Sequence, residues 1–318
     1  MIKKIIEISE SPTRLSIRLG QLIIKTQLPS ESGSPAPPRL RRVSAALRGT
    51  DSLERSIPCE DIGVLLVDNP ATVYTHCVFT ELLKHNAAVV FCDSNHLPAG
   101  MLLPIESNSI QTQRCTQQIK AKEPLKKKLW QQIVRAKIRH QAKIVKDNTK
   151  VHKALMELCS QVRSGDPVNV EARASKIFWS AYIQGIEFRR DSEGKPPNNL
   201  LNYGYMVMRA AVARAICSAG LLPSVGLHHR NKYNAFCLAD DLVEPFRGFV
   251  EVKVREIVQS EDWEELTQAI KARLLETLYE EVEIADYKGP LMVGLHRTAA
   301  SLVRCFSGEQ KKIDLPKI

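Results

Sequence analysis

The stretch GLHHRNKYNAFCLADDLVEPFR, from Gly226 to Arg247, gathers two histidines, two adjacent aspartates and a glutamate among apolar residues typical of a core. Asp241 and Glu244 are three positions apart, so on a helix their carboxylates would project from the same face. His229 precedes Asp241 by twelve positions, enough chain for a loop to bring its imidazole back to the same place. Carboxylates combined with one imidazole suit Mn²⁺ or Mg²⁺ better than a structural zinc ion. A further acidic ligand would come from elsewhere, and Glu171 in VNVEARASKIFW is the candidate.

The same acidic residues also fit a purely structural role. Asp-x-x-Glu is a helix capping box, with Asp241 as the N-cap and Glu244 at the third helical position. Alternatively, a helix could begin at Pro245, where the missing N–H costs little. A His-His pair is likewise more often exposed or hydrogen-bonded structure than a pair of ligands. Taken alone, Asp241 and Glu244 fit the capping role better than the ligand role.

Length, composition and charge narrow the class of protein. At 318 residues the chain is long enough for two domains and a sizeable core. The net charge of +10 favours a polyanionic partner, with nucleic acid ahead of an anionic membrane. No apolar run is long enough to cross a bilayer, and the N-terminal sequence MIKKIIEISESPTRLSIRLG has no cleavage-like site. We therefore expect a cytoplasmic protein.

The chain carries none of the common nucleotide or hydrolase motifs. Its eight cysteines include no C-x-x-C pair, so zinc-ribbon and thioredoxin chemistry lack support. Walker A, G-x-G-x-x-G and G-x-S-x-G patterns are absent as well.

Hydrophobic periodicity changes character near residue 105. Before that point, short β-rich runs such as IIEIS, LSIRL, LIIKTQ and IGVLLVD predict strands, with one helix in THCVFTELLKHN. After it, helical spacing dominates, and the last three helices are expected near 248–259, 262–284 and 290–306. The sequence predicts an α+β fold, with a β domain over residues 1–104 and a helical domain over 105–318.

Residues 110–145 predict a long amphipathic helical region with a basic face. Lysines are common on solvated helices, but this segment contains a single acidic residue, Glu123, which modestly favours a surface that follows a phosphate backbone. Its basic residues include Lys120, Lys122, Lys126, Lys127, Lys128, Arg135, Lys137, Arg139 and Lys143.

The ordered set of motifs resembles the CRISPR-associated integrase, the catalytic subunit of the CRISPR adaptation complex that acquires spacers. The N-terminal half carries the resemblance in IPCEDIGVLLVDNPATVYTHCVFTELLKHNAAVVFCDSNHLPAGMLLP. The C-terminal half carries it in VEARASKIFW, NNLLNYGYMVMRAAVARAICSAGLLPSVGLHH and AFCLADDLVEPFR. Together these blocks span roughly residues 57–247, and the EPFR ending looks most like the type II branch.

The resemblance implies a fold, partners and a cofactor. Such proteins have an N-terminal β-sandwich-like domain for dimerisation and a larger all-α catalytic domain. They form homodimers, assemble with a small ferredoxin-like partner subunit, bind double-stranded DNA (the spacer precursor and the CRISPR repeat) and have no membrane partner. They bind Mg²⁺ or Mn²⁺ through a glutamate, a histidine and an acidic residue.

Position by position, the resemblance also implies the site. Glu171 matches the glutamate of the E-A-x-x-x-x-x-x-W block, and His229 matches the histidine at the end of the G-hydrophobic-x-H block. Glu244 precedes P-F-R, and Asp241 matches the aspartate of D-L-x-E as a further metal ligand. The neighbours His228 and Asp240 are off-register by one position and are expected to be supporting or structural.

The implied reaction is a transesterification, in which a DNA 3′-hydroxyl attacks a phosphodiester of the repeat. Glu171, His229 and Glu244 would be catalytic, with a divalent ion that activates the hydroxyl and neutralises charge on the leaving oxygen. Basic residues near these positions would bind the DNA backbone: Arg173, Arg230, Lys232 and Arg247. The rival functions are a non-catalytic DNA-binding module and a scaffold subunit of the adaptation complex, and a membrane-surface role ranks last.

Overall fold

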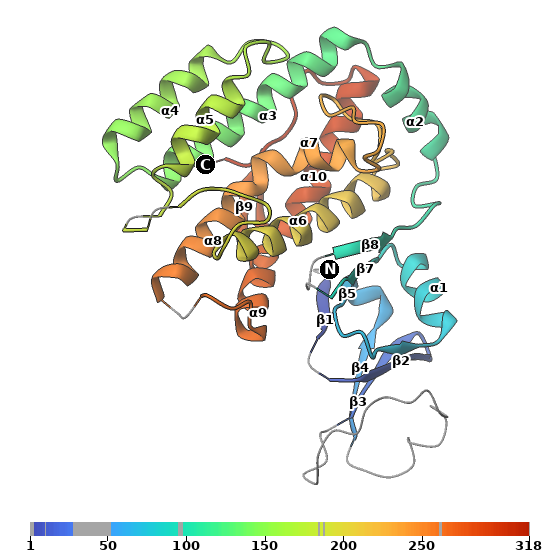
Figure 1. Ribbon diagram of the computed structural model, residues 1–318. Helices are drawn as coiled ribbons and strands as arrows, with labels where there is room; N and C mark the ends of the chain where they lie inside the picture. The colour runs from blue at the N-terminus through green and yellow to red at the C-terminus, as the bar shows by residue number, and fades with distance from the viewer. Residues whose placement is uncertain are drawn as a thin grey trace. The chain divides into compact units, whose positions relative to one another are not determined.

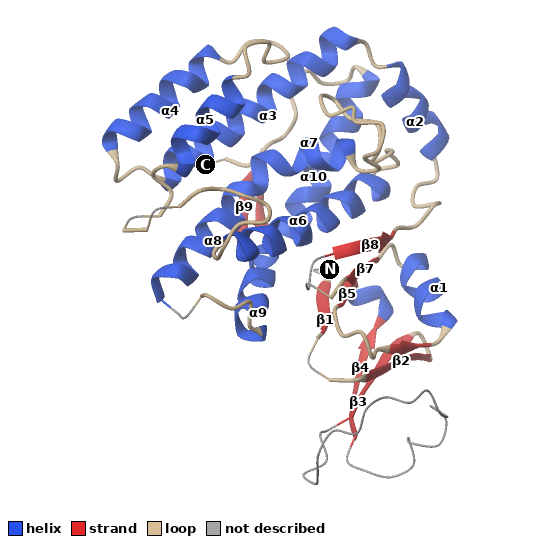
Figure 2. Cartoon of the chain, in the orientation of Figure 1, coloured by secondary structure: helices blue, strands red, loops and turns tan. Residues whose placement is uncertain are grey.

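The computed structural model describes residues 3–9, 11–27, 52–94, 98–183, 185–186, 188–260 and 263–317. The chain divides into two compact units, one ending at Leu102 and the other beginning at Leu103, whereas the sequence placed the boundary two residues later. Figure 1 follows the chain through its helices and strands, and Figure 2 separates the strands from the helices by colour. No helix within the described ranges is long and apolar enough to cross a membrane.

The N-terminal unit contains two four-stranded sheets. The first has the order β1-β5-β7-β8, with β1, β5 and β7 parallel and β8 antiparallel to β7. The second has the order β4-β3-β2-β6. The strands are β1 (Lys4–Ile8), β2 (Thr13–Arg18), β3 (Gln21–Gln27), β4 (Ser52–Pro58), β5 (Ile62–Val67), β6 (Val73–Tyr74), β7 (Ala88–Cys92) and β8 (Pro98–Leu102), joined by the short helix η1 (Cys59–Asp61) and by α1 (His76–Lys84).

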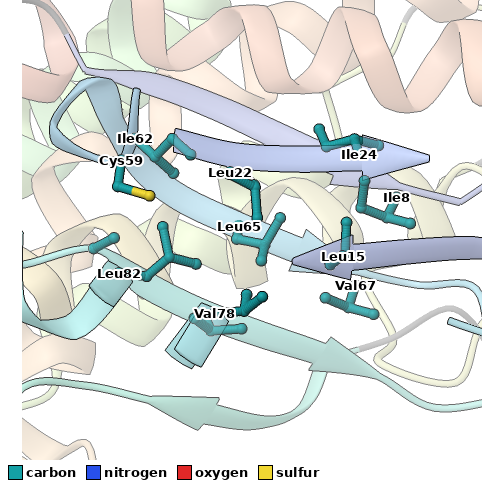
Figure 3. Packing of buried hydrophobic residues seen from close by; sticks show 12 residues of the cluster. Ile8, Leu15, Leu22, Ile24, Cys59, Ile62, Leu65, Val67, Val78 and Leu82 are labelled. Carbon is teal, nitrogen blue, oxygen red and sulfur yellow. The ribbon is translucent and has the colours of Figure 1, made fainter. Parts of the chain in front are cut away.

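The two sheets and α1 share one hydrophobic core. The central strand β5 is buried at every position, which explains its unbroken apolar run IGVLLV. Leu65 of β5 packs in the same cluster as Leu22 of β3, and α1 adds Leu82 (Figure 3). The predicted strands and the predicted helix of this unit are therefore present.

The C-terminal unit is mostly helical. Its helices are α2 (Gln111–Lys120), α3 (Glu123–Ile144), α4 (Thr149–Gln161), α5 (Val170–Trp179), α6 (Asn198–Ser218), α7 (Cys237–Val243), α8 (Arg247–Ser260), α9 (Gln268–Glu276) and α10 (Leu291–Ser307), with the short helices η2 (Glu244–Phe246) and η3 (Thr277–Tyr279). Helix α6 is buried over most of its length and packs against α7, α8, α9 and α10. Gly204 permits a close approach to α8, because a Cβ there would lie 2.5 Å from Cγ1 of Val250.

The expectation of an all-α second domain is wrong in one place. A β-hairpin, β9 (Glu281–Ile284) and β10 (Tyr287–Pro290), interrupts the helical pattern expected over 262–284, of which residue 262 lies outside the described residues. Val282 and Ile284 are buried while Glu281 and Glu283 are exposed, and this alternation is a strand period. The two apolar side chains pack against α10 at Gly294, where a Cβ would lie 2.8 Å from Cγ1 of Val282. Packing against a neighbouring helix thus decides a segment whose local pattern was ambiguous.

Candidate active site

Two acidic residues from distant parts of the sequence meet on one buried lysine. Lys137, on α3, is 7% exposed, and its ammonium group hydrogen-bonds Glu171 of α5. The same nitrogen lies 2.6 Å from Oε2 of Glu244 in η2. Burial would lower the pKa of Lys137, but the charges of the two carboxylates outweigh it and raise that pKa above its ordinary value. The sequence placed Lys137 on an exposed basic face, and the structure instead buries it at the centre of the site.

Glu171 is held in place by the first turn of α5. The carboxylate of Asp166 accepts hydrogen bonds from the backbone N–H groups of Val170 and Glu171, both at 2.9 Å. Asn169 caps the helix by accepting from Ala172 N–H. These bonds satisfy donors that a helix start leaves free, so they fix the backbone that carries the glutamate.

Glu244 is buried beside two cations. It lies in the turn between α7 and α8, with Nε of Arg247 at 3.1 Å from its Oε1. Burial would raise the pKa of Glu244, but the charges of Arg247 and Lys137 outweigh it and hold that pKa below its ordinary value. The guanidinium of Arg247 also lies 4.6 Å from the ring centroid of Tyr205. Glu244 is therefore kept ionised.

Asp241 organises the loop that carries His229. Its carboxylate is fully buried in α7, and Oδ2 accepts the backbone N–H groups of Leu227 at 2.5 Å and His228 at 3.0 Å. Oδ1 accepts the N–H of His229 at 3.2 Å and lies 2.7 Å from its Nδ1. The capping-box interpretation is wrong, because α7 begins after Phe236 and Asp241 lies in its interior.

The Asp241 contact fixes the chemistry of His229. Because an ionised carboxylate only accepts hydrogen bonds, Nδ1 is the donor, and Nε2 keeps its lone pair when the ring is neutral. The hydrogen bond to Asp241 raises the pKa of His229 above its ordinary value against the opposing effect of burial. Gly226 makes room for this turn, since a Cβ there would lie 2.8 Å from Oδ2 of Asp241.

The neighbouring His228 and Asp240 have other partners. The ring of His228 stacks on Trp130 with centroids 4.3 Å apart and planes 1° apart. Asp240 pairs with Arg209 at 2.6 Å and accepts a hydrogen bond from Asn234. In this structure the histidine and the aspartate whose side chains bind each other are His229 and Asp241.

A divalent ion was expected among these side chains, and its fit can be judged from their arrangement. Among the described residues, no group of three or more His, Cys, Asp or Glu side chains is arranged to hold a metal ion. Glu171 and Glu244 nevertheless share one cation, the ammonium of Lys137, and they supply the oxygen ligands that Mg²⁺ and Mn²⁺ prefer. Asp241 uses both carboxylate oxygens on the His229 loop. The carboxylate oxygens of the two glutamates are therefore better suited than those of Asp241 to bind a hard cation.

Of the four predicted DNA-binding residues, three are exposed. Arg173, Arg230 and Lys232 lie on the surface, and Arg230 pairs with Glu123 at 2.5 Å. Arg247 is instead half-buried in its pair with Glu244.

The structure also reveals a buried acid that the sequence did not single out. Glu251, one turn beyond Arg247 on α8, accepts a hydrogen bond from the Tyr205 hydroxyl at 2.8 Å. Its backbone carbonyl accepts one from the Tyr182 hydroxyl at 2.6 Å. Burial raises the pKa of Glu251 to about 7. In the sequence, the one sign of this residue was its seven-residue spacing from Glu244, which on a helix would place the two carboxylates on the same face.

Known proteins similar to this chain include members of one protein family. The sequence model of the family described as CRISPR associated protein Cas1 matches residues 39–271. The CRISPR-associated endonuclease Cas1 of Neisseria meningitidis serogroup C (strain 8013) is 36% identical over 267 residues, covering 83% of this chain and 87% of that protein.

Solved structures show a similar fold. A casposase bound to its integration product superposes with a TM-score of 0.78 at 19% identity, covering 98% of this chain and 92% of that chain. A Cas6-RT-Cas1–Cas2 complex contains a chain with a TM-score of 0.72 at 17% identity, and the match covers 97% of this chain and 35% of that chain. At sequence identities of 19% and 17%, these similarities show a shared fold only.

Proposed function

Because the chain belongs to the Cas1 family of CRISPR-associated proteins, we propose that it is a metal-dependent DNA integrase and endonuclease that inserts spacer-precursor DNA into a CRISPR array. The observation that carries the proposal is the convergence of Glu171 and Glu244 on one cation. The Neisseria relative is named an endonuclease, and the casposase structure holds an integration product.

Glu171, Glu244 and His229 are the residues that would hold Mg²⁺ or Mn²⁺. A bound divalent ion would supply activation of the attacking 3′-hydroxyl and neutralisation of charge on the leaving oxygen of the transesterification. Lys137 already supplies one positive charge to both carboxylates. Asp241, expected as a further ligand, takes a positioning role because its oxygens hold the His229 loop.

His229 is the residue suited to move a proton. Asp241 holds its Nδ1, so Nε2 is free either to bind the ion or to accept the proton of the attacking hydroxyl. The positive charges of Lys137 and Arg247 lie beside the carboxylates, where they also favour negative charge on a phosphate. The exposed Arg173, Arg230 and Lys232 would hold the DNA backbone.

The proposed assembly follows the same family. The N-terminal unit, with two sheets around a shared core, would serve as the β-sandwich-like domain that forms a homodimer. The Cas6-RT-Cas1–Cas2 complex supports a second protein as partner, which we propose is small and ferredoxin-like. The further ligands would be double-stranded spacer precursor and CRISPR repeat.

Strand transfer into a supercoiled plasmid carrying a CRISPR repeat tests the proposal. The reaction would contain the partner subunit, a short duplex with 3′-hydroxyl ends, and either Mn²⁺ or EDTA. Wild type should form product in Mn²⁺ but not in EDTA. Glu171→Gln should lower the rate of product formation in Mn²⁺ by about a hundredfold or more. Glu157→Gln, which changes an exposed glutamate on α4, is the matched control and should match wild type.

Two outcomes would contradict the proposal. Equal product from Glu171→Gln and wild type would remove Glu171 from the active site. DNA binding by wild type without product in any divalent ion would instead support the non-catalytic scaffold subunit.

A further inference from the structure

A cavity of about 380 Å³ lies among three helices that carry none of the proposed catalytic residues. Helices α2 and α6 both pack against α10 (Figure 1). The lining of the cavity includes Arg114 of α2, Ser218 at the end of α6, and His296 and Arg304 of α10. A volume of this size is typical of a site for a small ligand.

Arg114 is held in place with part of its guanidinium unused. Its Nη1 donates to the carbonyl of Ala219, the C-cap residue of α6, at 3.0 Å. Its side chain passes close to Gly220, where a Cβ would lie 3.0 Å from its Cδ. Nε is buried and has no hydrogen-bond partner among the described residues. Because a guanidinium can bind a phosphate through two parallel N–H groups, the Nε side of Arg114 suits an anion in the cavity.

The hydroxyl of Ser218 is a second polar group without a partner. Its Oγ is buried, and no group in the described parts of the chain hydrogen-bonds it. A buried polar atom that makes no hydrogen bond costs free energy, and a small rotation of the side chain toward an acceptor in the cavity would remove that cost. Arg114 and Ser218 therefore offer donors of the kind that phosphate oxygens accept.

The surroundings of the cavity carry more positive than negative charge. Arg304 adds a second guanidinium, and its pair with Asp314 is partly exposed and hence weak. Behind the lining, Arg214 is 4% exposed and its Nη1 lies 2.8 Å from Nε2 of His296. Burial lowers the pKa of Arg214 to about 10, so this guanidinium is still charged at neutral pH. Glu309 also lines the cavity, but it is exposed to solvent, which screens its repulsion of an anion.

We propose that this cavity binds the phosphate group of a small free ligand, held by Arg114, Arg304 and the hydroxyl of Ser218. The ligand is either inorganic phosphate or a small phosphate ester such as a nucleoside monophosphate. The remainder of an ester would contact the apolar part of the lining, which includes Ala300 and Val303. This site goes beyond the proposed integrase function and does not depend on it.

The test is a ³¹P NMR titration of the full-length chain with inorganic phosphate and, separately, with adenosine 5′-monophosphate. All samples contain EDTA, because a divalent ion could bring phosphate to the proposed active site. Adenosine, which lacks the phosphate, should not displace the monophosphate. Tighter binding of the monophosphate than of phosphate would identify an ester as the ligand, and equal or weaker binding would identify inorganic phosphate. A DNA duplex with 5′-hydroxyl ends is added as a competitor and should displace neither.

Ser218→Ala is the most informative variant, because the hydroxyl has no hydrogen bond to lose within the described residues. It should unfold at the same temperature as wild type and bind phosphate about tenfold more weakly. Arg114→Lys keeps the charge but removes the paired N–H groups, so it should also weaken binding by about tenfold or more. Arg297→Lys is the matched control, since Arg297 is exposed on α10 and pairs with Asp286. It should bind as wild type does.

Three results would overturn the proposal. Wild-type affinity for phosphate in Ser218→Ala and Arg114→Lys would show that the anion binds elsewhere on the protein. Displacement of phosphate by the 5′-hydroxyl duplex would assign the cavity to a DNA-binding surface instead of a small ligand. The third result is that wild type binds neither phosphate nor the monophosphate. If Arg114→Lys does not fold, Ser218→Ala decides the question by itself.

Discussion

Replacing Asp241 with asparagine should separate activity from stability. The asparagine oxygen can still accept from Leu227 and His228, in place of Oδ2. The asparagine NH₂ group would then occupy the place of Oδ1, where it faces the N–H and Nδ1 of His229. Two donors cannot bond each other, so the His229 N–H loses its acceptor at a cost of about 1–3 kcal/mol. Folding should survive this loss.

The larger effect concerns the tautomer of His229. With an amide NH₂ opposite Nδ1, the ring is stabilised with its proton on Nε2, so Nε2 no longer offers a lone pair to an ion or a proton. In a catalytic triad, the same carboxylate-to-amide exchange lowers the rate by about 10⁴-fold for this reason. We expect a loss of about 10³-fold or more in strand transfer by Asp241→Asn.

The neighbouring aspartate supplies a matched control. Asp240→Asn makes the same chemical change one residue earlier, where the carboxylate binds Arg209 and Asn234. It should retain activity. The assays are strand transfer, thermal unfolding, and ¹⁵N NMR of the histidine rings to identify the tautomer. Near-normal activity of Asp241→Asn with a switched tautomer would contradict this role of Asp241, and so would an equal loss of activity in Asp240→Asn.

Three further predictions concern the surroundings of the site. Lys137→Ala leaves two acidic groups without their shared cation, so it should destabilise the metal-free protein by about 3–5 kcal/mol. Mn²⁺ should then raise the midpoint of thermal unfolding more in this variant than in wild type, whereas Lys143→Ala, exposed on the same helix, should behave as wild type. The raised pKa of Glu251, about 7, means that the folded state binds this proton more tightly than the unfolded state. The resulting stabilisation is complete below pH 4.5 and is lost as the pH rises through about 7. The free energy of unfolding in urea should therefore fall by about 3 kcal/mol less over this pH range in Glu251→Gln than in wild type; an equal fall in both proteins would contradict the raised pKa of Glu251. Gly248→Ala would place a Cβ 2.3 Å from the ring of a buried histidine on α3 and should cost more than about 1 kcal/mol, whereas Gly100→Ala meets nothing within 4 Å; equal unfolding midpoints would disprove this.

The linear pattern of the chain was sufficient for most of the fold. The unbroken apolar run of β5 and the helical spacing of α6 identified their elements because each pattern is a local record of which faces are buried. The hairpin β9–β10 was not identified. Its short alternating segment depends on contacts with α10, and local sequence does not contain those contacts.

The site divides in the same way. The chemical types of the site residues could be predicted from the chain alone: Glu171, His229 and Glu244 were singled out because their spacing and motif blocks lie along the sequence. The contacts of those groups became known from the three-dimensional fold. It buried Lys137 between two carboxylates and turned Asp241 from a possible helix cap into the acceptor that orients His229. The physical reason is that charge pairing and desolvation depend on distances in space, and residues far apart in the sequence set those distances.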